Sequence, residues 1–293
     1  MTEANVVTWR PAHEIEVEDG HASSAYPDVD PIIDRPEVTQ IQLRTVFWLN
    51  IVAFFFQALA GGALIGLTDP KKRYYIYTYF PAVNSNGIPT GAAVADEIFY
   101  IPLGYLSAAF LLLSAIDHFL VFTVAKSSYE VGLVNEYNKY RWIEYSISAS
   151  VMRVMIAILS GISDVHTLIL IFGLTATTML FGLAFELENS NRPLGQIKWS
   201  NFWFGFVPHL FSWAIIFSYF FVGVSRSGNP PAFVWSIIII LFALDLSFAI
   251  VLFFQWRGRG CWYKYVNGEI GFILLSLTSK QLLAWLNFFG SNR

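Results

Sequence analysis

Long apolar stretches alternate with short polar segments along most of the chain beyond residue 40. Each stretch approaches or exceeds the roughly 20 residues that an α-helix needs to cross the hydrocarbon core of a bilayer. We therefore expect seven membrane-spanning helices, at residues 45–67, 98–125, 140–162, 165–187, 202–224, 232–256 and 266–289. Short connections between helices three and four, five and six, and six and seven predict that these neighbours run antiparallel.

Two segments depart from this pattern. Residues 68–96 are rich in Tyr, Thr, Gly and Pro, and the run YYIYTYF at residues 74–80 is typical of a strand. A short β-hairpin is expected there, with an irregular loop as the alternative. Residues 1–40 are polar and acidic, without apolar periodicity, which is typical of a disordered tail. The predicted domains are this tail and a seven-helix membrane domain over residues 41–293.

Composition supports a membrane protein. Hydrophobic residues make up 55% of the chain and charged residues 13%, whereas roughly a quarter of the residues in soluble domains are charged. No basic cluster with interleaved aromatic residues indicates a nucleic-acid partner. The single cysteine, Cys261, excludes an internal disulfide. The predicted fold class is all-α, a seven-transmembrane helix bundle in the lipid bilayer with a short β-hairpin after the first helix.

Lysine and arginine residues predict the orientation. They are more frequent in the short loops that share a face with the N-terminus than in those of the opposite face. Because positively charged loops remain in the cytoplasm, we expect a cytoplasmic N-terminus and, after seven crossings, an extracellular C-terminus. The hairpin at residues 68–96 then lies in the first extracellular loop.

Lys280 is the most informative residue, because it lies near the middle of the last predicted helix. Ionisable residues inside a membrane are costly and mark functional sites. One interpretation is a structural ion pair that holds this helix to a neighbour. The other is covalent chemistry, in which a desolvated neutral amine attacks an aldehyde to form a Schiff base. Ser276 on the same helical face and Trp285, which could wall an elongated apolar ligand, favour the second interpretation.

Glu144, near the start of the third helix, is the expected partner of that cation. A protonated Schiff base in a medium of low dielectric constant needs a nearby anion. Ser148 lies one turn further along the same face. The alternative is that Glu144 pairs with Arg141 at the level of the lipid headgroups.

Other ionisable residues in the spans are open to several interpretations. His118 could relay a proton or merely bond a serine. Asp245 and Arg153 could pair across helices, or Asp245 could be protonated and hydrogen-bonded. Glu186 and Glu188 are expected on a hydrated rim at the end of the fourth helix.

Aromatic and adaptable side chains could confine a polyene, although aromatic residues are common in membrane helices. The candidates are Trp203, Trp213 and Phe248, with Met179 as an adaptable surface.

The segment RWIEYSISAS at residues 141–150 closely resembles the helix-three motif of heliorhodopsins, and SLTSK, which ends at Lys280, resembles their retinal-attachment segment. The predicted cytoplasmic N-terminus also fits that family, whose topology is inverted relative to other microbial rhodopsins. The resemblance covers roughly residues 40–290. Phe54 is a departure, because several members have a histidine there.

The resemblance implies all-trans retinal on Lys280, with Glu144 as its counterion. It matches the following residues to family positions around the chromophore and the nearby polar cluster: Ser276, His118, Gln57, Met179 and Trp285. It also implies a homodimer in which the hairpin forms part of the contact.

The resulting hypothesis is a light sensor, not an enzyme, whose photocycle signals to an unidentified cytoplasmic partner rather than pumping ions. The alternative is a light-gated proton channel or transporter, motivated by the additional ionisable residues Asp117, Arg153 and Asp245. A transporter or receptor for a soluble ligand would require that no chromophore binds.

Overall fold

The computed structural model describes residues 35–228, 230 and 232–291. Over these residues, seven helices are long and apolar enough to span a membrane. They are α1 (Gln40–Leu67), α2 (Leu103–Phe122), α4 (Lys139–Leu159), α5 (Val165–Asn189), α6 (Ser200–Ser227), α7 (Ala232–Arg257) and α8 (Tyr265–Ser291). The predicted all-α seven-helix fold class with a hairpin is confirmed. The predicted disordered tail covers residues 1–40, of which residues 1–34 lie outside the described residues and residue 40 already belongs to α1.

The remaining elements lie between these helices. They are strands β1 (Tyr74–Val83) and β2 (Pro89–Ile101), helix α3 (Lys126–Val134) and the short 3₁₀ helices η1 (Leu194–Gln196) and η2 (Gly260–Tyr263). Helix α3 was not predicted, and it lies within the loop that was expected between the second and third spans.

Two helix starts differ from the prediction. Residues 98–101 were assigned to the second span, yet they end β2. Pro102 explains this, because the residue before a proline is held in an extended conformation. Helix α1 begins at Gln40, five residues before the predicted residue 45, because Thr39 and Gln42 form a reciprocal capping box at its start.

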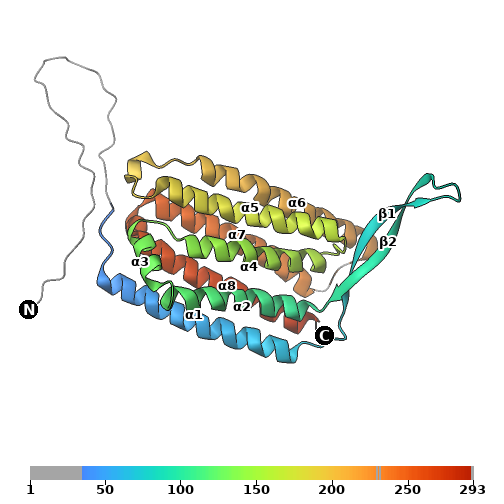
Figure 1. The fold of residues 1–293 in the computed structure, drawn as a ribbon, viewed down its shortest axis with the longest axis horizontal. Coiled ribbons are helices and arrows are strands. Elements are labelled where there is room, and N and C mark those ends of the chain that lie inside the picture. The colour runs from blue at the N-terminus through green and yellow to red at the C-terminus, as the bar shows by residue number, and fades with distance from the viewer. Residues whose placement is uncertain (1–34, 229, 231, 292–293) are drawn as a thin grey trace, which may run out of the picture. The chain divides into compact units, whose positions relative to one another are not determined.

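The hairpin lies beyond the helix ends at one end of the bundle, here called the hairpin end (Figure 1). Its strands are antiparallel, and the turn contains Gly87 at φ +74°, a conformation that favours glycine. The Tyr77 amide donates to the Ser163 carbonyl at 2.9 Å, in the loop between α4 and α5. Ile76 is 1% exposed and belongs to the apolar core, so the base of the hairpin is part of the bundle.

The helices run side by side (Figure 1), and α4 packs against α2, α5 and α7. In the described chain, the buried apolar side chains form two clusters. One lies towards the hairpin end and the other towards the opposite end, where α1 begins, here called the tail end. Along α8, Ile273 belongs to the tail-end cluster and Leu283 to the hairpin-end cluster. Lys280 therefore lies between the two clusters, in the interior.

Candidate functional site

A buried ion pair joins the last spanning helix to the third. The Lys280 ammonium on α8 donates to Glu144 Oε1 on α4 at 2.7 Å and to Ser114 Oγ on α2 at 3.0 Å. Lys280 is 3% exposed and Glu144 is 8% exposed. The Lys280 ammonium also lies over the Tyr145 ring in a cation–π contact, with Nζ 5.1 Å from the ring centroid. The pair meets the geometry of both sequence interpretations, a structural ion pair and a Schiff base with its counterion.

The alternative that Glu144 pairs with Arg141 is wrong. Arg141 lies about one turn nearer the tail end of α4, where it forms ion pairs with Glu186 of α5 and Glu269 of α8. Both of its anions are buried, at 0% and 2% exposure. Because Arg141 is neutralised by these two carboxylates, Glu144 is left to pair with Lys280.

An apolar cavity opens beside Lys280. Helices α4, α5, α6, α7 and α8 contribute its lining, which includes Tyr145, Met152, Leu241, Leu244 and the predicted residues Ser148, Met179, Trp213, Phe248, Ser276 and Lys280. Six of the predicted site residues are thus brought together around one space.

The cavity wall includes three buried serine hydroxyl groups, those of Ser148, Ser276 and Ser279. Ser148 is 0% exposed and Ser276 is 2% exposed. Within the described part of the chain, Ser148 Oγ has no hydrogen-bond partner. A buried hydroxyl without a protein partner in this wall leaves one hydrogen-bonding group open to a ligand in the cavity.

A neighbouring cavity extends the space towards the tail end of α6. It shares Met179, Asp245 and Phe248 with the first cavity. Its other walls include Trp142 and Gly182, which pack so closely that a Cβ on residue 182 would lie 2.2 Å from the Trp142 ring. The two cavities therefore adjoin at the three shared residues, between α4, α5, α6 and α7.

Four predicted residues lie outside these cavities. His118 Nδ1 lies 2.7 Å from Asn50 Oδ1, on the tail-end side of the ion pair, and bonds no serine. Gln57 and Trp285 both contact Gln281 rather than the cavity, at 3.4 Å and 3.0 Å. Trp203 was expected to confine the ligand, but the structure places it on the outer face of α6 with 58% of its surface exposed. A tryptophan there faces lipid.

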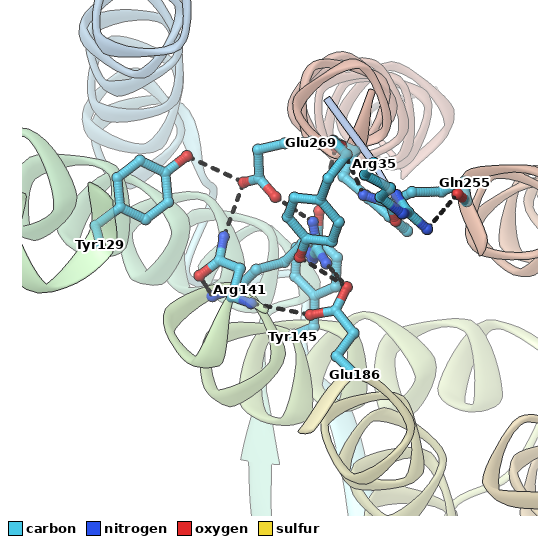
Figure 2. Close-up of polar contacts among 10 residues, drawn as sticks. Arg35, Tyr129, Arg141, Tyr145, Glu186, Gln255 and Glu269 are labelled. Atoms are coloured by element: carbon cyan, nitrogen blue, oxygen red, sulfur yellow. Dashed lines mark hydrogen bonds and ion pairs between the residues drawn. The ribbon is translucent and has the colours of Figure 1, made fainter. Parts of the chain in front are cut away.

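The tail end of the bundle holds a buried polar network, shown in Figure 2. Arg141 is its centre. The Tyr129 hydroxyl donates to Glu269 at 3.1 Å, and the Tyr265 hydroxyl donates to Glu186 at 3.1 Å. The prediction of a hydrated rim is wrong for Glu186, which is fully buried, whereas Glu188 is partly exposed and pairs with Lys198.

Arg35 extends this region from the segment before α1 (Figure 2). Its guanidinium donates to the Gln255 carbonyl at 2.8 Å and lies 4.8 Å from the centroid of the Trp256 ring. Burial lowers the pKa of Arg35 from its ordinary value, and the Glu136 carboxylate at 3.4 Å opposes this effect. The segment before α1 is thereby fastened to α7.

The sequence analysis missed several members of the site. Ser114 and Asn50 have no distinguishing pattern, since polar residues of this size also occur in ordinary helix packing. Glu269 did carry a signal, because it falls within the span predicted at residues 266–289. An acidic residue inside a predicted span is a functional or structural partner by default.

A small polar cavity separates the ion pair from this network. Its lining includes Glu144, Asp117, His118, Asn50 and Glu269. Ionisable and amide groups therefore follow one another from the middle of the membrane to the tail end.

The bundle has the microbial rhodopsin fold. It is similar to the crystallographic structure of xanthorhodopsin, a light-driven ion pump with dual chromophore, with a TM-score of 0.59. The match covers 88% of this chain and 98% of that chain at 12% sequence identity, so it shows the fold alone. No curated protein matches the sequence.

The chain belongs to the heliorhodopsin family, whose model matches residues 46–291. The resemblance identified from the sequence is thus confirmed. Family and fold together make this a retinal-binding, light-responsive protein with multiple membrane spans.

The residues present fit such a chromophore. A single buried amine borders elongated apolar space among the described residues, a carboxylate lies within hydrogen-bond distance of that amine, and the unpartnered Ser148 hydroxyl faces the same space. Met179, Trp213 and Phe248 would border the polyene.

Proposed function

We propose that this protein senses light with all-trans retinal bound to Lys280 as a protonated Schiff base, and that Glu144 is the counterion. The observation that supports this most strongly is the 2.7 Å contact between the Lys280 amine and the Glu144 carboxylate beside an apolar cavity. A buried ion pair contributes little stability by itself, because desolvation offsets its Coulomb attraction. Its position against an elongated cavity favours a functional role.

The Lys280 amine would attack the aldehyde carbon, forming a C=N bond and releasing one water molecule. Retinal supplies absorption of visible light and photoisomerisation when bound, and the protein tunes both. Glu144 then balances the positive charge that the protonated nitrogen carries. Ser114, which accepts a hydrogen bond from the free Lys280 amine at 3.0 Å, would lie beside the single N–H group of the protonated Schiff base.

Proton acceptors near this nitrogen lie on the tail-end side. His118 and Asn50 form a hydrogen-bonded pair at 2.7 Å, and both border the small polar cavity that Glu144 lines. A proton released towards Glu144 would be held in this cluster and returned. Phe54 packs against Phe119 and Phe122 on the neighbouring helix surface, so this part of α1 offers no second histidine.

Signalling rather than pumping is favoured by the apolar hairpin end. On the hairpin side of Lys280, Phe110, Leu111 and Leu283 are each 0% exposed, and the buried polar groups there are paired with one another, Ser107 with Asn287 and Arg153 with Asp245. Protons do not cross such packing without polar groups or water. The charge bias of the loops orients the tail end towards the cytoplasm, where a signalling partner would bind, with the C-terminus outside.

The second candidate is a light-gated proton channel or transporter. The small polar cavity favours it, because Asp117, Glu269 and Glu144 line one space that leads from the ion pair towards the tail end. A channel would need this chain of groups to continue through the hairpin-end packing.

Voltage-clamp recording of retinal-supplied cells under bright light separates the two functions. We expect no sustained photocurrent in cells whose membranes contain the coloured pigment. A current that reverses with the proton gradient and disappears in Lys280→Ala would establish the channel instead. Lys126→Ala, which removes a partly exposed lysine of α3, is the matched control.

A homodimer is also proposed. The hairpin exposes aromatic side chains, including Tyr79 at 47%, Phe80 at 48% and Phe99 at 46%. Exposed aromatic surface of this kind commonly marks an interface. Cross-linking of cysteines introduced at Tyr79 tests whether a second copy packs there, since a monomer would give no covalent dimer.

A further inference from the structure

A second buried ion pair borders the same cavity. Arg153 of α4 pairs with Asp245 of α7, so the alternative in which the two residues pair across helices is correct. The Arg153 side chain is 4% exposed and that of Asp245 is 19% exposed. Both residues line the cavity beside Lys280, and Asp245 also lines the neighbouring cavity. The cavity wall therefore contains two opposite charges, although apolar side chains would be enough to enclose an apolar ligand.

The carboxylate of this pair is held by several donors. Arg153 Nη2 and the Trp213 indole nitrogen, at 2.9 Å, both donate to Asp245 Oδ2, and His209 Nδ1 lies 3.5 Å from the same oxygen. Arg153 is held in turn, since its Nη1 donates to Ser212 Oγ at 2.8 Å. Its guanidinium also lies 4.4 Å from the centroid of the Trp213 ring. Multiple contacts keep both charges in fixed positions.

The two ion pairs lie at different depths. At roughly 1.5 Å of rise per residue, Arg153 lies about 13 Å further along α4 than Glu144. Glu144 contacts the amine itself, whereas Arg153 and Asp245 border the cavity away from it, beside Leu241 and Leu244. A polyene attached to Lys280 and lying in this cavity would therefore pass close to the second pair along its length.

We infer that the Arg153–Asp245 ion pair determines the absorption wavelength of the pigment. The inference rests on the proposed attachment of retinal to Lys280. Light absorption by a protonated polyene Schiff base moves positive charge away from the nitrogen and along the chain. A carboxylate beside the polyene stabilises the excited state and shifts absorption to longer wavelength, whereas a cation there does the opposite. The pair sets the colour through the balance of these two fixed charges.

Neutralising each partner in turn tests the inference. Asp245→Asn leaves the Arg153 cation uncompensated, and the absorption band moves to shorter wavelength. Arg153→Gln leaves the Asp245 carboxylate uncompensated, and the band moves to longer wavelength. Each shift is on the order of 10 nm or more, as expected for a unit charge a few ångströms from a moving charge. The absorption band of the double variant lies between those of the two single variants, because the two effects oppose each other.

The matched control is Ser150→Ala, a change at a fully buried α4 residue that does not line the cavity. Its band stays at the wild-type position. Single shifts of the same sign, or bands that coincide with that of the control, would overturn the inference. A purely structural ion pair would lower the thermal stability of the retinal-free protein in both single variants and leave the band unmoved.

Removing one partner of a buried ion pair can prevent folding. Arg153→Lys is therefore included, because it keeps the positive charge but loses the forked donor geometry. Its band stays close to the wild-type position because both charges are kept, and a shift as large as that of Arg153→Gln would contradict the inference. Failure of the proposed function has a different signature, since wild-type protein would remain colourless with retinal or Lys280→Ala would retain the colour. Either result would also remove this inference.

Discussion

Lys280 and Glu144 meet at 2.7 Å although they lie on helices α8 and α4, far apart in sequence. Each would be costly alone, because an unpaired charge in an apolar interior loses its hydration without compensation. Together with Ser114 they form a polar centre between two apolar clusters. This relationship supports the proposal that the chromophore attaches to the amine of Lys280.

Glu144→Gln should weaken proton binding at the chromophore nitrogen. Removal of the carboxylate takes away an attraction of about 4 kcal/mol at an effective dielectric constant near 20, which corresponds to proton binding weakened on the order of 100- to 1,000-fold. A pH titration of the visible band measures this, and the band should be lost at lower pH than in the wild type. Glu130→Gln, at a surface pair with Lys126, should leave the titration unchanged. Identical titrations of Glu144→Gln and wild type would identify another residue as the counterion.

Glu269→Gln should destabilise the tail-end network. It leaves Arg141 with one carboxylate instead of two in a buried site, and breaking such a pair typically costs about 3–5 kcal/mol. Thermal unfolding of the purified protein in detergent checks this. Glu188→Gln disrupts a partly exposed pair with Lys198 and should cost about 1 kcal/mol or less. Equal melting temperatures of the two variants would contradict the structural role of the network.

Gly182→Ala should disturb the cavity wall at Trp142. A Cβ at this position would lie 2.2 Å from the Trp142 ring, so the ring or α5 must move, and overpacking of this kind costs about 1–3 kcal/mol. The control is Gly173→Ala on the same helix, where no atom lies within 4 Å of the added carbon. The melting temperature should fall below that of the wild type for Gly182→Ala only. Equal melting temperatures of the two variants would mean that the packing around Trp142 is loose.

The elements of the bundle could be predicted from the apolar pattern because membrane spans need long uninterrupted runs. Their ends could not, since local contacts decide them. Residues 98–101 are apolar enough for a helix, but Pro102 and pairing with β1 place them in a strand. Helix α3 is too short and too polar to be recognised as a membrane span.

The site was predictable where a single residue was unusual in its context. Lys280 and Glu144 are charges in apolar segments, which is sufficient to single them out. Which charge pairs with which depends on helix rotation and depth, and this is why Glu186 was expected on a hydrated rim although it binds Arg141 inside the bundle. Trp203 illustrates the same limit, because an aromatic residue in a span can face either lipid or the interior.

Ser148→Ala should stabilise the retinal-free protein or leave it unchanged. Its hydroxyl is buried without a partner in the described residues, so the substitution removes a desolvated polar group, worth about 1 kcal/mol or more. Ser150→Ala should instead lower stability by about 1 kcal/mol, because that hydroxyl donates to the Ser146 and Phe172 carbonyls. Melting curves of both retinal-free variants provide the comparison, and a larger loss for Ser148→Ala would mean that its hydroxyl is bonded.

Covalent attachment at Lys280 is tested most directly by reduction of the retinal-supplied protein with borohydride, followed by mass analysis of its peptides. Reduction converts the C=N bond into a stable amine and fixes the chromophore to its lysine. We predict a retinyl adduct on the peptide that contains Lys280 and no adduct in Lys280→Ala. A coloured protein whose adduct lies on a different lysine, or a protein that acquires neither colour nor adduct, would contradict the account.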